Sequence, residues 1–285
     1  MTPFRLQSNI HSLLTQRKIQ LQKRKLRIRK APKMLYPNSI ERDYIRDLIG
    51  LTDTLKERTQ EILIPLLPRI IEESNLLRPR KTDTYSDLIY ETMQKLRFGF
   101  GNTYTERDME DMASTMAELT SNFSRKQVGR VLSTMIGIDV FFNEAWLQDE
   151  MKGFVENNVA LIKSIPQKYF SEIEGITFQG ARQGLTINTI KDQIEKRYEV
   201  SESKATLIAR DQIGKFFGQL NELRQQDVGI DKYVWRTVGD NRVRPSHRDK
   251  DGRVFSWNRP PADTGHPGWD YQCRCWAEPY LQDLI

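Results

Sequence analysis

Residues 201–238, SESKATLIARDQIGKFFGQLNELRQQDVGIDKYVWRTV, contain the change of pattern that decides the fold. In the first part, apolar residues recur at three- and four-residue steps. This predicts a helix with a wide apolar face up to about residue 227, closed by Gly229. From residue 232 to 238 the side chains become β-branched and aromatic, which predicts a strand. We therefore expect an α+β protein, with a mainly helical body and a small β-containing, loop-rich C-terminal module.

The chain upstream of residue 201 continues the helical pattern. Apolar spacing and start signals predict helices at residues 41–77, 85–98, 105–121, 124–136, 143–165 and 186–198. The start signals are Thr103 or Thr105, Ser124 and Thr186. Pro166 is expected to end the helix before it, because proline has no amide donor. Apolar residues of these helices are expected to build a core rather than a cofactor site.

The chain downstream of Gly229 has a different composition. It holds four of the five tryptophans, five of the twelve prolines, both cysteines and two of the three histidines. A second strand is predicted at residues 253–257, after the turn pair Asp251-Gly252. The sequence thus predicts three segments: a basic arm at residues 1–38, a helical region at 39–150, and a domain at 151–285 whose β-containing module starts near residue 230.

Length and composition exclude several protein classes. The chain has 285 residues, of which 38% are hydrophobic and 29% charged, so a folded protein with a real core is expected. The longest apolar stretch, residues 62–67, is far shorter than the roughly 20 residues that cross a bilayer. No secretory signal is visible, and two cysteines cannot form a disulfide framework. We expect a cytoplasm-like compartment and no membrane partner.

The N-terminal arm carries the positive charge. Residues 1–40 hold ten Lys or Arg and no Asp or Glu, whereas the formal net charge of the whole chain is +6. Such a segment seeks a polyanion, so DNA is the first candidate partner. An amphipathic helix on an anionic membrane, an acidic protein groove and a solvated arm without a ligand are the alternatives. The predicted phosphate-binding residues are Arg17, Lys18, Lys23, Arg24, Lys25, Arg27, Arg29 and Lys30.

The C-terminal module contains one complete set of four nitrogen and sulfur donors, His247, His266, Cys273 and Cys275. Tetrahedral zinc requires such a set, and a structural zinc ion would stabilise a module with little core. The Cys-x-Cys spacing is tighter than in standard zinc sites, so Asp240, Asp249 or Asp270 could replace a histidine. The competing interpretation is that the thiols are buried as small hydrophobic groups and the imidazoles bind loop backbone.

An enzymatic interpretation of the same residues is a metal-dependent nuclease with a histidine base. It is less favoured, because no known catalytic motif is present and no spacing singles out two of the carboxylates. The arginines of this region alternate with aspartates, so internal ion pairs are the default expectation for them.

Residues 157–279 resemble the phage head morphogenesis family, the minor capsid proteins similar to protein F of phage Mu. The resemblance is carried by an aromatic strand, the run Gly239-Asp240-Asn241-Arg242-Val243-Arg244-Pro245-Ser246-His247, the turn Asp251-Gly252, a Pro-rich loop and Cys273-Arg274-Cys275. The upstream helix, with Arg210-Asp211 and Asn221, also resembles the family. The family motif residues are Trp235, Asp240, Arg242, Arg244, His247, Asp251 and Gly252.

The resemblance implies a low-copy virion component, not an enzyme. It would associate with the portal and inner capsid during procapsid assembly, inside the phage head, after synthesis in the host cytoplasm. Contact with packaged double-stranded DNA is implied as well, in agreement with the basic arm. Arg210 and Asp211 are expected to form an ion pair or cap rather than to act in catalysis. A metal-dependent DNA nuclease and a non-viral DNA-binding protein remain the alternatives.

Overall fold

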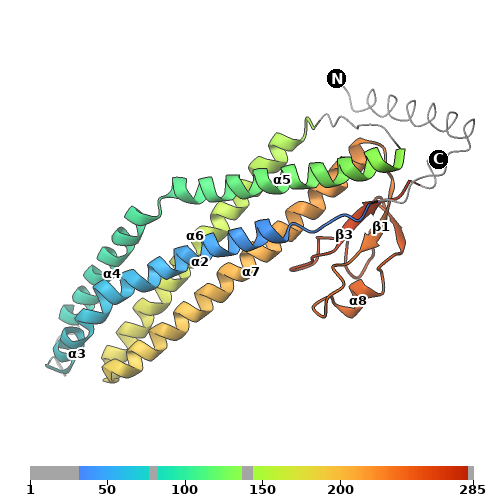
Figure 1. Ribbon diagram of the computed structural model, residues 1–285. Helices are drawn as coiled ribbons and strands as arrows, with labels where there is room; N and C mark the ends of the chain where they lie inside the picture. Colours follow the sequence, from blue (N-terminus) through green and yellow to red (C-terminus); the bar gives the residue numbers. More distant parts are fainter. Residues whose placement is uncertain (1–31, 77–82, 137–143, 282–285) are drawn as a thin grey trace, which may run out of the picture. The chain divides into compact units, whose positions relative to one another are not determined.

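The structure, a computed structural model, describes residues 32–76, 83–136 and 144–281 (Figure 1). Helices precede a small antiparallel sheet near the C-terminus, which confirms the predicted α+β class. The eight predicted phosphate-binding residues of the basic arm lie outside the described residues. The helical elements are α2 (Asn38–Arg58), η1 (Thr59–Leu63), η2 (Ile64–Leu66), α3 (Leu67–Leu76), α4 (Asp83–Thr103), α5 (Glu106–Ile136), α6 (Leu147–Gln183), α7 (Ile187–Asp227) and α8 (Pro245–Arg248).

The described residues form two compact units. One, the helical unit, comprises residues 42–114 and 155–209. The other, the module-bearing unit, comprises the described residues up to 41, those between 115 and 154, and those from 210 onwards. Within the second unit we call residues 230–281 the C-terminal module. The division of the sequence at residues 38 and 150 stays a prediction.

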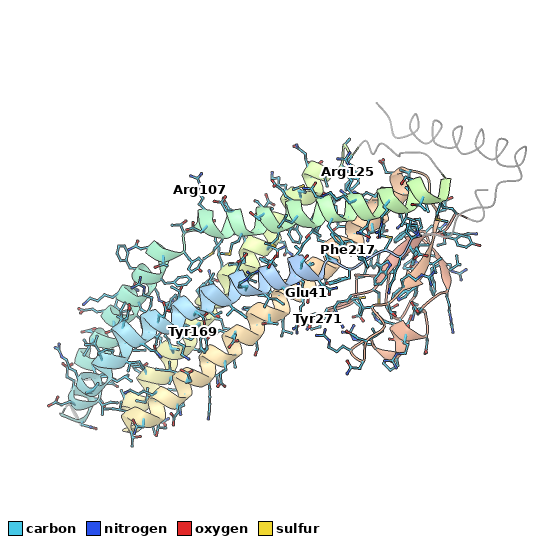
Figure 2. All side chains as sticks on the ribbon, viewed as in Figure 1. Glu41, Arg107, Arg125, Tyr169, Phe217 and Tyr271 are labelled. Carbon is cyan, nitrogen blue, oxygen red and sulfur yellow. The ribbon has the colours of Figure 1, made fainter. Side chains whose placement is uncertain are left out.

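The helical unit is held by an apolar core and a few buried polar contacts. The leucines of α2 are fully buried, as are Ile162 and Ile173 of α6. The hydroxyl of Tyr169, labelled in Figure 2, donates to Thr59 Oγ1 at 3.1 Å. Ser74 Oγ donates to the carbonyl of Ala181 at 2.6 Å. Burial of apolar surface at about 25 cal/mol per Å² is the main stabilising contribution in such a unit.

Two predicted helix boundaries are wrong because side chains that resemble caps bond elsewhere. Helix α5 runs through Ser124, whose hydroxyl donates to Asn221 Oδ1 at 2.7 Å instead of capping a helix. Helix α7 runs through Ser201, whose hydroxyl bonds back to the carbonyl of Arg197 at 2.9 Å. By contrast, Thr105 and Thr186 do cap α5 and α7, through bonds from the backbone N–H groups three residues on.

Two prolines act differently from the prediction. Helix α6 continues through Pro166, although a proline in a helix interior costs about 3 kcal/mol. Ile162 and Ile165 before it and Tyr169 after it are buried, so packing on both sides offsets the lost hydrogen bond. The predicted helix at 41–77, however, is broken into α2 and α3 by the π-helical η1 and the 3₁₀ turn η2 around Pro65.

The module contains a three-stranded antiparallel sheet in the order β2-β1-β3. The strands are β1 (Lys232–Arg236), β2 (Val254–Ser256) and β3 (Trp276–Pro279). The first two confirm the predicted strands. The third was not predicted, because its four residues include Glu278 and Pro279, which are rare in strands. Glu278 is nevertheless buried, since it accepts a hydrogen bond from Arg236 at 2.9 Å.

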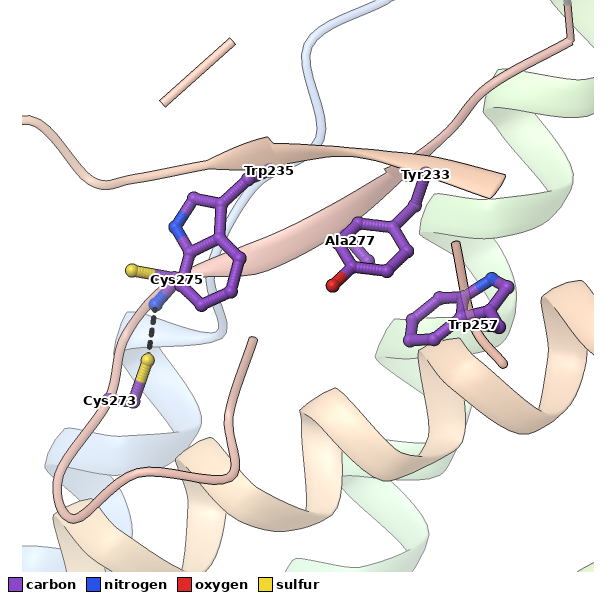
Figure 3. Packing of buried hydrophobic residues seen from close by; sticks show 6 residues of the cluster. All are labelled: Tyr233, Trp235, Trp257, Cys273, Cys275 and Ala277. Carbon is purple, nitrogen blue, oxygen red and sulfur yellow. Dashed lines mark hydrogen bonds between the residues drawn. The ribbon is translucent and has the colours of Figure 1, made fainter. Parts of the chain in front are cut away.

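The core of the module is a small cluster built on this sheet. It consists of Tyr233, Trp235, Trp257, Cys273, Cys275 and Ala277 (Figure 3). The ring centroids of Tyr233 and Trp257 lie 4.2 Å apart. In the figure both sulfur atoms lie on the Trp235 side of the cluster, away from Tyr233 and Trp257. The module thus has an aromatic half and a sulfur-bearing half.

Candidate metal centre

Three donor side chains meet at the sulfur-bearing half of the module. His247 lies on the four-residue helix α8, and the two cysteines lie directly before β3. All three are buried. His247 Nδ1 is 3.5 Å from Cys273 Sγ and 3.4 Å from Cys275 Sγ, and the three donor atoms all lie within 4.8 Å of one another. We call this group the His-Cys-Cys centre.

The spacing of these atoms fits a tetrahedral metal ion. Zinc binds imidazole nitrogen at about 2.0–2.1 Å and thiolate sulfur at about 2.3 Å, so tetrahedral angles place the two donors about 3.6 Å apart. The observed separations of 3.4 and 3.5 Å are close to this value. Both thiols lie close to the same ring nitrogen, so both the types of donor atom and their separations fit a zinc site. The centre can therefore hold a metal ion.

The other ring nitrogen of His247 is held by a carboxylate. Nε2 lies 3.0 Å from Asp270 Oδ2, and the same oxygen accepts a hydrogen bond from Arg244 Nη1 at 3.0 Å. With Nε2 carrying the proton, Nδ1 presents its lone pair to the sulfur atoms. A metal-bound histidine usually donates its second N–H in this way, which fixes the tautomer and the ring orientation. Trp235 also packs edge-on against the imidazole, with ring centroids 5.5 Å apart.

The two thiols differ in acidity. The pKa of Cys273 is lowered to about 5, chiefly because the Cys275 thiol donates to its sulfur. The backbone N–H groups of Cys275 and Gly268 add donors at 3.4 and 3.5 Å (Figure 3 shows the first). The same contact raises the pKa of Cys275. The contact with Cys273 also raises the pKa of His247, because a second proton on Nδ1 would be donated to the Cys273 sulfur when no metal is bound. The contact with Cys275 therefore favours the thiolate form of Cys273, which is the form that binds metal.

Helix α7 positions the cysteine loop by close backbone contact. A Cβ atom on Gly214 would lie 2.5 Å from the carbonyl oxygen of Cys273, and one on Gly218 would lie 2.4 Å from that of Pro267. Glycine is needed at both positions, because these oxygens belong to the backbone. The spacing of four residues puts both glycines on one helix face. This pair is the sequence signal by which the contact could have been predicted.

Asp211 fixes the residue before Cys273. Its Oδ1 accepts a hydrogen bond from the backbone N–H of Gln272 at 2.9 Å, and its Oδ2 accepts one from Lys215 at 2.7 Å. Gln272 has a φ of 51°, a left-handed conformation that is uncommon outside glycine. The Asp211 bond stabilises this conformation, so the aspartate acts as an ion pair and a loop anchor.

The structure does not bring His266 into the centre. Its Nε2 donates to the carbonyl of Trp257 at 3.0 Å, and its Nδ1 accepts from the Tyr233 hydroxyl at 2.8 Å. Both nitrogens are thus used in the aromatic half of the module, and burial lowers the pKa of this histidine. The four-donor set predicted from the sequence is therefore not assembled. His247, Cys273 and Cys275 come together, and His266 binds as the competing interpretation expects.

Two of the three aspartates considered as replacement ligands, Asp240 and Asp270, have other partners. Asp240 accepts two hydrogen bonds from Arg274, each of 2.8 Å, and Asp270 lies on the far side of the His247 ring. Neither belongs to a metal-binding group among the residues that the structure describes. These ion pairs agree with the default expectation for the arginines of this region.

The remaining family motif residues build the frame of the centre. Trp235 is fully buried on β1, and its backbone carbonyl accepts from the N–H of Gly252 at 2.8 Å. Gly252 has a φ of 77°, which glycine adopts without strain, and Asp251 accepts from the backbone N–H of Thr237 at 2.9 Å. The turn Asp251-Gly252 therefore ties the end of α8 to β1. Arg242 is the most exposed of the motif arginines (59% of its side chain).

No helix in the described part of the chain is long and apolar enough to span a bilayer.

Comparison with known proteins identifies the segment that contains this centre. Residues 171–278 match the model of a family described as Phage Mu protein F like protein. An uncharacterized protein of Haemophilus influenzae is 35% identical over 171 residues, and one of Methanocaldococcus jannaschii is 24% identical over 188 residues. These alignments cover 60% and 62% of this chain but only 37% and 29% of the relatives, so the chain spans about a third of their length. No solved structure shows a significant match. Residues 171–278 therefore match the phage Mu protein F-like family, and this match supports the relation of the segment to the phage head morphogenesis proteins.

Proposed function

We propose that this protein is a minor head component that joins the portal and the inner capsid during procapsid assembly. The observation that carries the proposal is the family match over residues 171–278, which contains α7, the sheet and the His-Cys-Cys centre. Its role is to supply an attachment surface, not to turn over a substrate. The protein then resides inside the phage head, after assembly in the host cytoplasm.

The module offers a surface suited to such attachment. Trp269 and Tyr271 are half exposed (51% and 50%), and Val254 is 44% exposed. Tryptophan and tyrosine are enriched in the central contacts of protein interfaces. The two aromatic residues flank Asp270, whose carboxylate contacts His247 of the His-Cys-Cys centre. This contact fixes the loop that carries both aromatic side chains. A rigid loop of this kind loses little conformational entropy on binding.

The test is co-assembly of the full chain with portal and major capsid protein. Trp269→Ala with Tyr271→Ala should reduce the amount of this protein in purified procapsids by about tenfold or more, because central aromatic contacts contribute about 2 kcal/mol or more. Tyr90→Ala with Phe98→Ala is the matched control, since these exposed aromatics lie in the helical unit. A wild-type chain absent from procapsids would refute the proposal.

The basic arm is proposed to contact packaged DNA. Its eight basic residues between Arg17 and Lys30 would neutralise phosphates and release counterions, so affinity should fall steeply with salt. Deletion of residues 1–35 should remove most of the DNA affinity and flatten its dependence on salt concentration. An unchanged affinity and salt slope in a filter-binding or anisotropy assay would reject this role.

The His-Cys-Cys centre is proposed to bind one structural zinc ion. His247, Cys273 and Cys275 would hold it, and Asp270 would orient the imidazole. The ion would tie α8 to the segment before β3, and in small loop-rich domains such binding supplies part of the folding free energy. X-ray absorption of the zinc-loaded chain should give a sulfur shell at about 2.3 Å with a nitrogen or oxygen shell at about 2.0–2.1 Å. A spectrum without sulfur neighbours would contradict the assignment.

Metal-dependent hydrolysis of DNA is the second candidate function. It is favoured by one observation: the centre has three donors among the described residues, and catalytic zinc sites commonly use three protein ligands. A nuclease would cleave DNA in the presence of magnesium, manganese or zinc and would lose this activity in His247→Ala. Incorporation into procapsids without any cleavage would leave the structural role as the sole candidate.

A further inference from the structure

A pocket of about 230 Å³ opens directly onto the His-Cys-Cys centre. Its wall contains all three donor residues, so a metal ion bound there would face the pocket. The other polar groups of the wall are dominated by four arginines, Arg210, Arg242, Arg244 and Arg274. A pocket that combines a metal centre with several guanidinium groups is suited to an anion.

The centre needs one more donor than the described chain provides. Tetrahedral zinc takes four ligands, whereas the group of donor atoms here has three members among the described residues. The two nearest candidates are committed elsewhere. His266 uses both ring nitrogens, and Asp270 lies at Nε2 of His247, on the opposite side of the ring from the sulfur atoms. The fourth position is therefore left to a molecule in the pocket.

The arginines of the pocket are not fully matched by carboxylates. Arg274 binds Asp240 with two hydrogen bonds of 2.8 Å, and Arg244 binds Asp270 at 3.0 Å. Each of these two arginines is thus paired with a carboxylate at hydrogen-bond distance.

The other two arginines have only loose partners. Arg242 lies 3.6 Å from Asp240, whose oxygens Arg274 already uses. Arg210 lies 3.6 Å from Glu41, and its buried Nε has no hydrogen-bond partner among the described residues. Among the described residues, no carboxylate lies within hydrogen-bond distance of the Arg210 guanidinium, so this group can pair with a further anion. The four arginines are thus paired with only three carboxylates, and one additional anion would balance the remaining positive charge.

We propose that the pocket binds a phosphate group, one oxygen of which occupies the fourth position of the metal while Arg210 and Arg242 hold the others. This inference rests on the proposed metal site. The guanidinium group donates two parallel hydrogen bonds that match phosphate oxygens, and a metal ion with two thiolate ligands has no net charge left to repel the anion. The phosphate is either a free ion or the terminal phosphate of a DNA strand, and both present the same oxygens.

The test uses the full chain loaded with cobalt(II), which replaces zinc and absorbs visible light according to its ligands. Inorganic phosphate should shift the absorption bands in a saturable way, with one phosphate per chain. The source is distinguished by a short oligonucleotide with a 5′-phosphate and the same oligonucleotide without it. A shift with the phosphorylated strand only would assign the site to a DNA end, and a shift with inorganic phosphate only would assign it to the free ion.

Two double variants locate the phosphate. Arg210→Gln with Arg242→Gln should raise the dissociation constant for phosphate about tenfold or more, because hydrogen bonds to charged groups contribute about 1.5–3 kcal/mol. Cobalt stoichiometry should not change. Arg253→Gln with Arg259→Gln removes the same charge from exposed positions outside the pocket wall, and it should leave the constant unchanged.

The possible failures are distinguishable. A chain that binds no cobalt would overturn the metal site, and this inference with it. A chain that binds cobalt but shows no shift with any phosphate would overturn the inference and leave the metal site intact. An equal loss of affinity in both double variants would mean that the phosphate responds to net charge alone, which would overturn the assignment to the pocket.

Discussion

In the helical unit, Leu48, Leu51 and Leu55 of α2 are all fully buried, and each contributes through the apolar surface that it removes from water. In the C-terminal module, the two cysteines, one histidine and one aspartate meet through polar contacts of 3.0 to 3.5 Å. Apolar contacts are non-directional and tolerate substitution of similar volume. The contacts of the His-Cys-Cys centre depend on particular atoms, so the module should be far more sensitive to single changes.

The two regions also differ in whether their stability depends on a bound metal ion. In the described part of the helical unit no group of donor side chains could hold a metal ion, and buried polar groups such as Tyr44 and Asn158 bind each other, here at 3.1 Å. The module has a core of six residues in its main cluster, two of which are cysteines. Its stability should therefore depend on whether the centre is occupied.

The largest expected effect is that of metal removal. Chelation should unfold the module and leave the helical unit folded, because metal binding supplies roughly 10–16 kcal/mol in small zinc domains. Trp235, Trp257, Trp269 and Trp276 lie in the module, so tryptophan fluorescence should change strongly. Far-UV circular dichroism, which reports mainly on helices, should change little. If chelation leaves the fluorescence unaltered, the proposed difference between the two regions does not exist.

A core truncation in the helical unit should have the next largest effect. Leu55→Ala should lower the free energy of unfolding by about 2–5 kcal/mol, through lost apolar contact and a cavity. Urea unfolding followed by circular dichroism measures it, and the zinc content should stay as in the wild type. Leu207→Ala, at a residue 37% exposed in the same unit, is the control and should change stability by about 0.5 kcal/mol or less. Loss of zinc in Leu55→Ala would show that the two regions are not independent.

Gly218→Ala tests the close approach of α7 and the cysteine loop. The added Cβ would lie 2.4 Å from a backbone oxygen, so we expect a loss of about 1–3 kcal/mol and weaker zinc binding. Gly153→Ala is matched to it, because no atom lies within 4 Å of its added Cβ. That variant should stabilise the chain by about 0.4–1 kcal/mol, through a less flexible unfolded chain. Equal effects of the two substitutions in thermal unfolding would contradict the close contact.

The last expected effect, on zinc affinity rather than on stability, concerns Asp270, which binds Nε2 of His247. Asp270→Ala should weaken zinc binding about tenfold to a hundredfold, the usual result of losing a partner that orients a metal ligand. Competition with a zinc-binding dye measures the affinity. Asp263→Ala removes an exposed carboxylate that pairs with Lys250 and should leave the affinity unchanged. An Asp270→Ala chain with wild-type affinity would mean that the His247–Asp270 contact does not support the centre.

The sequence predicted the regular apolar pattern of the helical elements better than the contacts that depend on particular side chains. The apolar periodicity of α2, α4 and α7 and the strand at Lys232–Arg236 were predictable, since burial of one face leaves a repeating pattern. Breaks in the helices were not, because the hydroxyls of Ser124 and Ser201 resemble caps and only their partners in space show otherwise. The local sequence pattern does not show a partner such as Asn221, which is far from Ser124 in the sequence but close to it in space.

For the centre, the sequence indicated the right residue types but not the right set. His247, Cys273 and Cys275 converge, whereas His266 sits in the aromatic half because Tyr233 and Trp257 satisfy both of its nitrogens. The four-residue spacing of Gly214 and Gly218 indicates a close approach on one helix face, but the loop that they contact lies about fifty to sixty residues further along the chain, so only the fold identifies it. Donor chemistry is thus predictable from composition, and donor selection is not.

The most direct test of the proposed zinc site is the zinc content of the purified chain, measured by elemental analysis. The thermal unfolding of the same sample is measured beside it. We predict about one zinc ion per chain in the wild type and none in a Cys273→Ser, Cys275→Ser variant, whose module should unfold at a lower temperature. A wild-type protein that contains no metal, and whose unfolding does not change when zinc is added, would contradict the proposed zinc site.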